Sequence, residues 1–191
     1  MDDVRYKPIG ILHSPFKKPQ NVPIQSAASK GIKGSVEVAR EYVEGLKDLE
    51  GFSHIILVYH CHLSRDYSLT VKPYLDDENV HGVFSTRAPS RPNPIGISIV
   101  RLIKIEDNIV YIQDLDIIDG TPLLDIKPYV PEFDQRNATR IGWLKDDIKK
   151  LYEFEMTAGF LVSRRLRSPK IVKSCYTQIL HLQHSKSMKL N

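Results

Sequence analysis

Cysteine is scarce in this sequence, and long apolar runs and a secretion signal are missing. The 191 residues contain two cysteines, Cys61 and Cys175, which lie far apart and form no C-x-x-C pair. We therefore expect free thiols. No apolar run approaches the roughly 20 residues that a membrane span needs. The first residues, M-D-D-V-R-Y-K, lack the apolar stretch of a signal peptide, so we expect a cytoplasmic protein without a membrane partner.

Several motifs that mark common enzyme folds are also missing. The chain has no P-loop, no G-x-S-x-G, no H-E-x-x-H, and no G-x-G-x-x-G after a predicted strand. Their absence argues against a doubly wound nucleotide-binding fold and against the common hydrolase plans. His60 and His62 would share one face of a continuing strand, but no third ligand follows at a suitable spacing. The aspartates of residues 114–125 lack the EF-hand spacing, so we expect no metal.

The residues that are present suit one globular domain with a basic appendage. Hydrophobic residues make up 41% of the chain and charged residues 26%, which is typical of a soluble fold. Charge is uneven: residues 1–141 hold 17 Lys and Arg against 19 Asp and Glu, whereas residues 142–191 hold 10 against 4. We expect a domain at 1–141 and a basic extension at 142–191, which indicates a polyanionic partner for the extension.

Short alternating segments dominate the first part of the chain. Eight are expected as strands: Val4–Ser14 (broken near Pro8–Gly10), Ser35–Ala39, Phe52–His60, Val71–Leu75, His81–Ser85, Ile97–Ile105, Ile109–Leu115 and Leu123–Val130. The turn Glu106-Asp107-Asn108 joins two of them in a hairpin, because Asp and Asn tolerate positive φ. The pattern predicts a mainly β fold, a single small β-barrel with short helices, followed by a helical, basic C-terminal extension.

The stretch Ser85–Gly96, S-T-R-A-P-S-R-P-N-P-I-G, stands out between two apolar runs. Its three prolines fall within six residues, and each fixes its own φ and removes an N–H donor. The segment is therefore expected to be a stiff loop with more carbonyls than donors. Arg87, Arg91 and Asn93 project from it, so we interpret it as a binding surface held on a scaffold.

A second polar segment runs from Asp114 to Pro122, where aspartates alternate with apolar residues before Gly-Thr-Pro. Asp116, Asp119 and Asp125 are candidates for a site, and Asp119-Gly120 is expected to turn the chain. Structural roles remain open at this point, because Asp125 is able to pair with Lys127 and Asp116 is able to cap a turn.

Together these segments resemble the TsaA-like family, also called YaeB or TrmO. The similarity rests on I-G-I-L-H-S-P-F, L-E-G-F-S-H-I-I-L-V-Y-H, G-V-F-S-T-R-A-P-S-R-P-N-P-I-G-I-S and D-L-D-I-I-D-G-T-P-L-L-D-I-K-P-Y-V-P, in the family's order across about residues 5–134. It implies a β-barrel methyltransferase that uses S-adenosylmethionine and acts as a homodimer. The implied product is a methyl group on N6 of N6-threonylcarbamoyladenosine at position 37, in the anticodon loop of a threonine tRNA.

The resemblance also implies a set of site residues. The cofactor pocket would comprise Pro23, Ile24, Gln25, His60, Cys61, Arg87, Arg91, Ser98, Ile118, Asp119, Gly120, Thr121 and Pro122. Ile24 stands where family members commonly have Arg. Because N6 loses a proton, a base is needed, and Asp116, Asp125 and His60 are equal candidates. The extension offers phosphate contacts at Arg164, Arg165, Arg167, Lys170 and Lys173, and Tyr67, Tyr74 and Tyr129 are candidates for stacking on the base.

Two other functions remain open from the sequence. One is a non-catalytic S-adenosylmethionine-binding module that regulates a partner. The other is a methyltransferase that acts on a small molecule, for which the basic extension would serve solubility alone.

Overall fold

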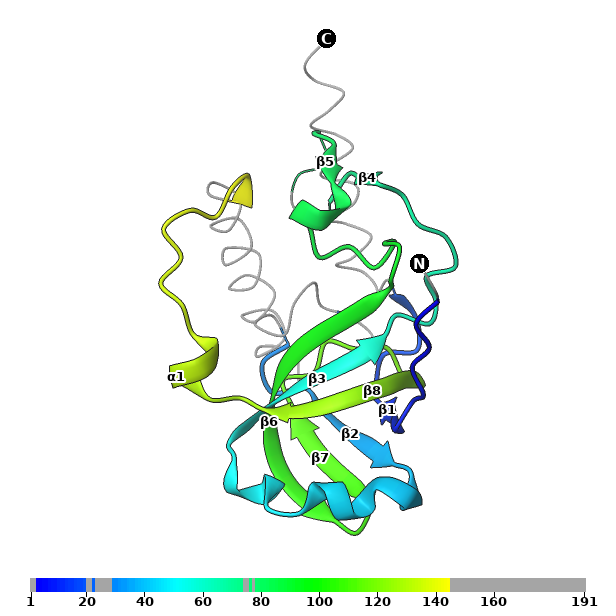
Figure 1. The fold of residues 1–191 in the computed structure, drawn as a ribbon, viewed down its shortest axis with the longest axis vertical. Helices are drawn as coiled ribbons and strands as arrows, with labels where there is room; N and C mark the ends of the chain where they lie inside the picture. The colour runs from blue at the N-terminus through cyan, green and yellow to red at the C-terminus, as the bar shows by residue number, and fades with distance from the viewer. Residues whose placement is uncertain (1–2, 20–21, 23–28, 74–75, 77, 145–191) are drawn as a thin grey trace, which may run out of the picture. The chain divides into compact units, whose positions relative to one another are not determined.

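A closed antiparallel barrel forms the body of the protein (Figure 1). The computed structural model describes residues 3–19, 22, 29–73, 76 and 78–144. Within these residues, six strands close in the order β1-β2-β7-β6-β3-β8. Their bounds are β1 Gly10–His13, β2 Lys33–Val38, β3 His54–His60, β6 Ile95–Glu106, β7 Ile109–Gln113 and β8 Thr121–Pro128. The predicted mainly β barrel is confirmed.

Period-two alternation explains why this sequence closes on itself. The burial pattern of β1 is buried-exposed-buried-exposed, and β6 alternates in the same way through Ser98, Val100 and Leu102. The inward side chains meet in one core, in which Leu12, Ile55, Leu57, Val100 and Leu123 are fully buried. Since every strand of the barrel pairs with two others, the sheet leaves no open edge.

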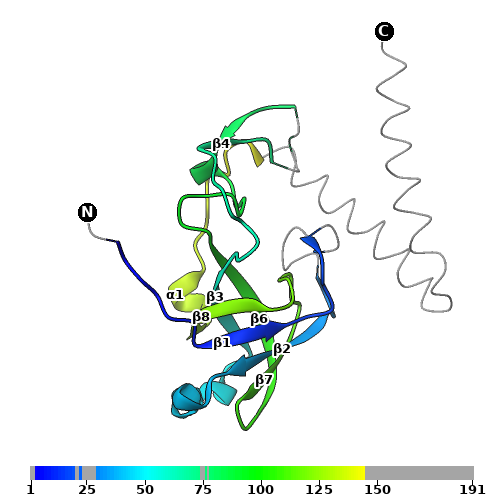
Figure 2. The ribbon, with the colours of Figure 1, turned by 90° about the vertical axis from the view of Figure 1, so that its right-hand side faces the viewer.

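The turn between β6 and β7 seals one end of the barrel, at the bottom of Figure 2. Asp107 has a φ of 53°, as the predicted tight turn requires. Asn108 is buried, and its side-chain nitrogen donates to the carbonyl of Val38 at 2.9 Å. Two 3₁₀ helices, η3 (Arg40–Leu46) and η4 (Leu49–Gly51), connect β2 to β3. The backbone nitrogen of Ile105 in β6 donates to the Glu50 side chain of η4 at 3.0 Å, which ties the connection to the barrel.

A smaller hairpin lies beyond the other end of β3 and β6 (Figure 1). Its strands are β4, Thr70–Val71, and β5, His81–Gly82. The expected strand His81–Ser85 was wrong in its second half, because Val83–Ser85 forms the 3₁₀ helix η5 instead. Val83 is fully buried, and its burial turns the chain toward the proline-rich loop. A short helix, α1 (Pro131–Asp134), follows β8.

The chain divides into two compact units, Met1–Thr139 and Arg140–Asn191. The structure describes residues 140–144 of the second unit, so the predicted helices of the extension and its five candidate phosphate-binding residues lie outside the described residues. The boundary predicted at residue 141 stays a prediction. No helix among the described residues is long and apolar enough to cross a membrane.

Candidate active site

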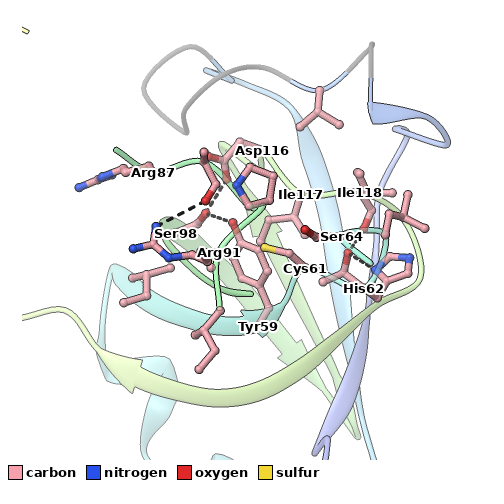
Figure 3. Close-up of a pocket in the computed structure, with 18 of the residues that line it drawn as sticks. Tyr59, Cys61, His62, Ser64, Arg87, Arg91, Ser98, Asp116, Ile117 and Ile118 are labelled. Carbon is pink, nitrogen blue, oxygen red and sulfur yellow. Dashed lines mark hydrogen bonds between the residues drawn. The ribbon is translucent and has the colours of Figure 1, made fainter. Parts of the chain in front are cut away.

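A cavity of about 880 Å³ opens at the end of the barrel opposite the β6–β7 turn. Four parts of the chain line it: the segment after β1, the end of β3 with residues 61–64, the proline-rich loop with the start of β6, and a last group made of Asp116, Ile117, Ile118 and Thr121. Figure 3 shows Arg87, Arg91 and Ser98 on one side of it, with His62 and Ile118 on the other. The volume is within the range of roughly 300–1,000 Å³ that small-molecule sites occupy.

The proline-rich loop is stiff for the reason that its sequence suggests. The Pro94 carbonyl accepts from the nitrogen of Cys61 at 2.7 Å, which fixes the loop to the end of β3. The missing backbone donors are replaced in part by Arg91, whose Nη1 donates to the carbonyls of Thr86 at 3.2 Å and Ala88 at 3.5 Å. Arg91 thus holds the loop's own carbonyls as well as lining the cavity.

Arg87 is presented differently from Arg91. It lines the cavity and is exposed. Among the described residues, no hydrogen bond or ion pair to its guanidinium is found. Arginine binds carboxylate and phosphate oxygens in pairs. Arg87 is therefore available at the mouth of the cavity for an anionic group.

A chain of hydrogen bonds crosses the cavity wall from Tyr59 to Asp116. The Ser98 hydroxyl donates to Oδ1 of Asp116 at 2.6 Å, and the Tyr59 hydroxyl lies 3.2 Å from the Ser98 oxygen. Because the single Ser98 proton goes to the carboxylate, Tyr59 is the donor to Ser98. Burial and the Asp116 charge raise the pKa of the Tyr59 phenol far above its usual value, so this phenol keeps its proton. The arrangement holds the Asp116 carboxylate in a fixed position at the cavity.

Gly96 makes room for the Tyr59 ring. The two residues are partners in the β3–β6 ladder. A Cβ at position 96 would lie 2.2 Å from Cε2 and 2.4 Å from Cζ of Tyr59, which no real contact tolerates. The last residue of the S-T-R-A-P-S-R-P-N-P-I-G motif is thus a glycine because the Tyr59 ring packs directly against its backbone. The hydroxyl of this ring is the first donor in the hydrogen-bonded chain.

His62 and Thr121 form a second polar pair at the cavity. Thr121 donates its hydroxyl to the carbonyl of Ile118 at 2.7 Å, and Nδ1 of His62 lies 3.3 Å from the same hydroxyl oxygen. Nδ1 therefore carries the proton, and Nε2 is left as an acceptor. Burial, with a smaller effect of the nearby His60, lowers the pKa of His62, which favours this neutral form.

Cys61 lies on the same wall as a half-buried free thiol. Burial raises the pKa of Cys61, and the neighbouring Arg91 opposes this rise. Burial has the larger effect, so the side chain is a neutral thiol that packs rather than a nucleophile.

Comparison with known proteins assigns this site to a family. The model of the tRNA-methyltransferase O N-terminal domain matches residues 11–135, which is more than half of the chain. The chain belongs to the TrmO family. The matched residues contain the whole cavity lining described above.

Relatives inside and outside the archaea agree with this assignment. A probable S-adenosyl-L-methionine-binding protein of Pyrococcus abyssi is 63% identical over 76% of this chain and 79% of that protein. The tRNA (adenine(37)-N6)-methyltransferase of Escherichia coli is 36% identical over 69% of this chain and 60% of that enzyme. The crystal structure of TrmO from Pseudomonas aeruginosa superposes with a TM-score of 0.62 and 35% identity, over 74% of this chain and 63% of that one. The chain thus spans less than two thirds of the latter two proteins.

The cavity brings together about half of the residues expected at the TrmO site. From the cofactor set it gathers Cys61, Arg87, Arg91, Ser98, Ile118 and Thr121, and from the candidate bases it gathers Asp116. Pro23, Ile24 and Gln25 lie outside the described residues. His60, Asp119, Gly120, Pro122 and Asp125 are described but do not line the cavity.

Local contacts explain these five exceptions. Asp119 accepts from the nitrogen of Ser14 at 2.9 Å and pairs with Lys17 at 2.6 Å, so both of its oxygens hold the segment after β1. Asp125 pairs with Lys127 at 2.7 Å. Pro122 and His60 lie in the barrel ladders, opposite Ile11 and Ile95. Gly120 has a φ of 75° and makes the predicted turn. The roles expected of these residues in binding or catalysis stay predictions.

Sequence reasoning did not single out Tyr59 or Gly96 as site residues of this TrmO member. Tyr59 lies in the most apolar run of the chain, where an aromatic residue is expected in any core strand. The position of its ring depends on Gly96, which lies opposite it on β6. Gly96, which follows the last proline of the loop, was a signal that could have pointed to this contact, because a glycine inside a strand often marks the close approach of another group.

Proposed function

We propose that this protein transfers a methyl group from S-adenosylmethionine to N6 of N6-threonylcarbamoyladenosine at position 37 in the anticodon loop of a threonine tRNA. Membership in the TrmO family supports the class of reaction, and the name of the Escherichia coli relative, tRNA (adenine(37)-N6)-methyltransferase, supports the position. The observation that carries the proposal is the Tyr59–Ser98–Asp116 chain at the cavity. We also expect the reaction to take place in the cytoplasm.

The cavity residues fit S-adenosylmethionine by their chemistry. Arg87 and Arg91 supply cations for a carboxylate, and Ile95, Ile117 and Ile118 supply an apolar wall. When bound, this cofactor supplies a methyl group that its sulfonium already activates, and the sulfur keeps the electron pair of the broken carbon–sulfur bond. The protein's main task is then to orient the acceptor, for which near-attack geometry contributes roughly 7–11 kcal/mol.

Asp116 is the residue best placed to take the proton that N6 loses. The lone pair of this nitrogen is delocalised into the ring and the carbamoyl group, so removal of its N–H proton makes it a better nucleophile. The proton goes to the Asp116 carboxylate as the bond from N6 to the methyl carbon forms. Ser98 and Tyr59 act as positioning residues, because Ser98 donates to the carboxylate and Tyr59 donates to Ser98. Asp125 and His60 do not line the cavity, which favours Asp116 among the three candidates.

The test uses the purified full-length chain, labelled S-adenosylmethionine and two forms of threonine tRNA, with and without the threonylcarbamoyl group. We expect label on the modified tRNA alone, in a nucleoside that mass spectrometry identifies as the N6-methylated product. Label on both forms would keep the methyltransferase and reject the threonylcarbamoyl requirement. No label on either form rejects the proposal.

A binding role without catalysis is the second candidate, because the Pyrococcus abyssi relative is named for binding S-adenosylmethionine. It predicts that calorimetry detects binding of the cofactor while no cellular RNA is methylated. Binding accompanied by transfer to tRNA excludes it. A small-molecule methyltransferase, in turn, would keep its activity when residues 142–191 are removed, whereas tRNA affinity should fall.

We further propose that the protein acts as a homodimer through the outer face of β6. Ile97, Ile99 and Ile103 are 62%, 41% and 48% exposed, and Ile97 is paired with Val58 of β3. An apolar sheet face of this kind is typical of a protein–protein interface. Ile97 and Ile99 also line the cavity, so a second copy would border it. Analytical ultracentrifugation should give a dimer for the native chain and a monomer for Ile97→Glu; a native monomer contradicts the expectation.

A further inference from the structure

Two aromatic side chains are highly exposed beside the cavity, where the proposed reaction does not use them. Phe84 in η5 is 76% exposed and Tyr67 before β4 is 62% exposed. Burying an aromatic side chain is strongly favourable, so these rings offer binding energy to a ligand that covers them.

The turn that carries Phe84 is rigid. Val83 is fully buried beneath it. The Val83 carbonyl accepts from both the backbone nitrogen and the hydroxyl of Thr86, at 3.1 and 2.9 Å. The Ser85 hydroxyl donates to the carbonyl of Gly82 at 2.7 Å. These bonds fix the backbone on both sides of Phe84, so its ring is presented outward without a large loss of chain entropy on binding.

Both aromatic residues lie on chain segments that are joined to the rim of the cavity. Phe84 is two residues before Thr86 and three before Arg87, which line the cavity. On the other segment, the nitrogen of Ser68, next to Tyr67, donates to the carbonyl of Ser90 at 3.3 Å, and Ser90 is also a lining residue. Both chain segments that carry the rings therefore border the cavity.

The charge near the two rings favours a polyanion. Residues 63–69 and 82–91, which carry the two rings, contain three arginines, at 65, 87 and 91, against one acid, Asp66, whereas the intervening residues 70–81 hold three acids against one lysine. Arg87 is exposed. Exposed aromatic rings interspersed with arginine are the usual surface for unpaired nucleotides, because every base has a face that stacks on an aromatic ring.

We infer that Phe84 and Tyr67 form a stacking platform for unpaired RNA bases on either side of the nucleotide that enters the cavity. This inference rests on the proposed function. A base taken out of a loop loses its stacking neighbours, and the platform replaces the stacking that the adjacent bases lose. It assigns RNA recognition to the barrel unit, in addition to any contact that the basic extension makes.

The test measures binding of a fluorescent anticodon stem-loop, with the threonylcarbamoyl group on its adenosine, by anisotropy with the full-length chain. Phe84→Ala should weaken binding roughly 5- to 100-fold, and Phe84→Trp should retain it. Phe133→Ala is the matched control, because Phe133 is 72% exposed but lies in α1. Tyr67→Ala should give a smaller loss. Calorimetry with S-adenosylhomocysteine should give the same affinity for all variants.

Abasic substitutions in the RNA locate the contact. If Phe84 stacks on a base beside the target adenosine, an abasic residue at that position should lower native affinity and abolish the further effect of Phe84→Ala. Phe84→Ala that binds the stem-loop as tightly as the native chain overturns the inference, as does a change in oligomeric state alone, which would indicate a protein interface. A native chain that does not bind the stem-loop also overturns it. Native binding without methyl transfer rejects the proposed function and leaves the platform supported.

Discussion

At the end of the barrel that the β6–β7 turn closes, Asn108 and Glu50 bind backbone groups, whereas at the cavity end three side chains also bind one another in a chain. Asn108 donates to the carbonyl of Val38, and Glu50 accepts from the nitrogen of Ile105. At the cavity, Tyr59, Ser98 and Asp116 are joined side chain to side chain. The strands β3, β6 and β7 reach both ends of the barrel. The same strands therefore support polar side chains that bind the backbone at one end and polar side chains that bind one another at the other end.

This difference indicates that the polar side chains at the closed end serve the stability of the fold, and that the linked side chains at the cavity serve its chemistry. A buried side chain that satisfies a backbone group removes a desolvation penalty from the folded state. A carboxylate held by a hydroxyl that a second hydroxyl orients, beside a cavity, costs desolvation and conformational entropy, which is the usual sign of a group kept for its chemistry. Substitutions at the two ends should therefore alter different measurements, and four of them test that expectation.

The largest effect is expected at Asp116. Asp116→Asn keeps the shape and still accepts from Ser98, but it is not able to take a proton from N6. Loss of a positioned base lowers kcat by roughly 10²- to 10⁴-fold. Single-turnover methylation of the modified tRNA measures this loss, while calorimetry with S-adenosylhomocysteine should give a nearly unchanged affinity.

Asp125→Asn is the matched control for Asp116→Asn. Asp125 pairs with Lys127 in β8 and does not line the cavity, so the variant should keep kcat within about twofold, since exposed ion pairs contribute little. Equal losses in both variants would contradict the assignment of Asp116 as the base.

Gly96→Ala should lower both the stability and the methylation rate, because the added methyl group displaces the Tyr59 ring. The added Cβ overlaps the ring at 2.2–2.8 Å, and overpacking of this kind lowers the free energy of unfolding by about 1–3 kcal/mol. The displaced phenol no longer donates to Ser98, so the rate should fall with the stability. Urea unfolding and methylation kinetics measure the two losses.

Gly82→Ala provides the comparison for Gly96→Ala. A Cβ at Gly82 meets nothing within 4 Å, and its φ is −60°, so alanine fits without strain. Both stability and rate should stay close to native values. If Gly96→Ala also keeps native stability and rate, then the Tyr59 ring does not need a glycine at position 96.

Asn108→Ala should lower stability and leave the chemistry unchanged. The variant removes the donor to the Val38 carbonyl at a site that is 8% exposed, which costs about 1–2 kcal/mol of unfolding free energy. The rate per folded molecule should equal that of the native chain, because the residue lies at the sealed end. A fall in kcat at full folding would show that the two ends are coupled.

The sequence predicted most of the barrel because its strands carry strong local signals. Residues 55–59 are continuous in apolar character, and the hairpin around Asp107 has both alternation and turn chemistry. Of the strand expected at Val4–Ser14, only Gly10–His13 forms, as β1, and the part expected before Pro8 was wrong. The strand expected at His81–Ser85 failed after Gly82, because the burial of Val83 overrides the β propensity of Val and Phe there.

The sequence predicted which segments form the site, but it did not predict which side chains within them act. Prolines identified the loop, but three candidate bases were equivalent in the sequence. The hydrogen bond from Ser98 to Asp116 depends on how β6 lies against residues 114–116, whereas Asp125 pairs with Lys127 of its own strand, as the sequence allowed. The pairing of Tyr59 with Gly96 likewise depends on strand register, which no local pattern states.

The smallest effect is expected at Asp119, which holds the segment after β1 without lining the cavity. The hydrogen bond from Lys17, and then that from the nitrogen of Ser14, lower the pKa of Asp119 below its usual value of 3.8. A carboxylate with a lowered folded pKa stabilises the fold above its unfolded pKa, and this contribution is lost as the pH falls through the lowered value. Asp119→Asn should therefore reduce the fall in melting temperature below about pH 4, and Lys17→Ala should reduce it less, because Ser14 remains. The change should be small, since the Lys17 side chain is 69% exposed and water screens the pair. An Asp119→Asn variant with the full native acid dependence would mean that this carboxylate contributes nothing to the cavity end of the barrel.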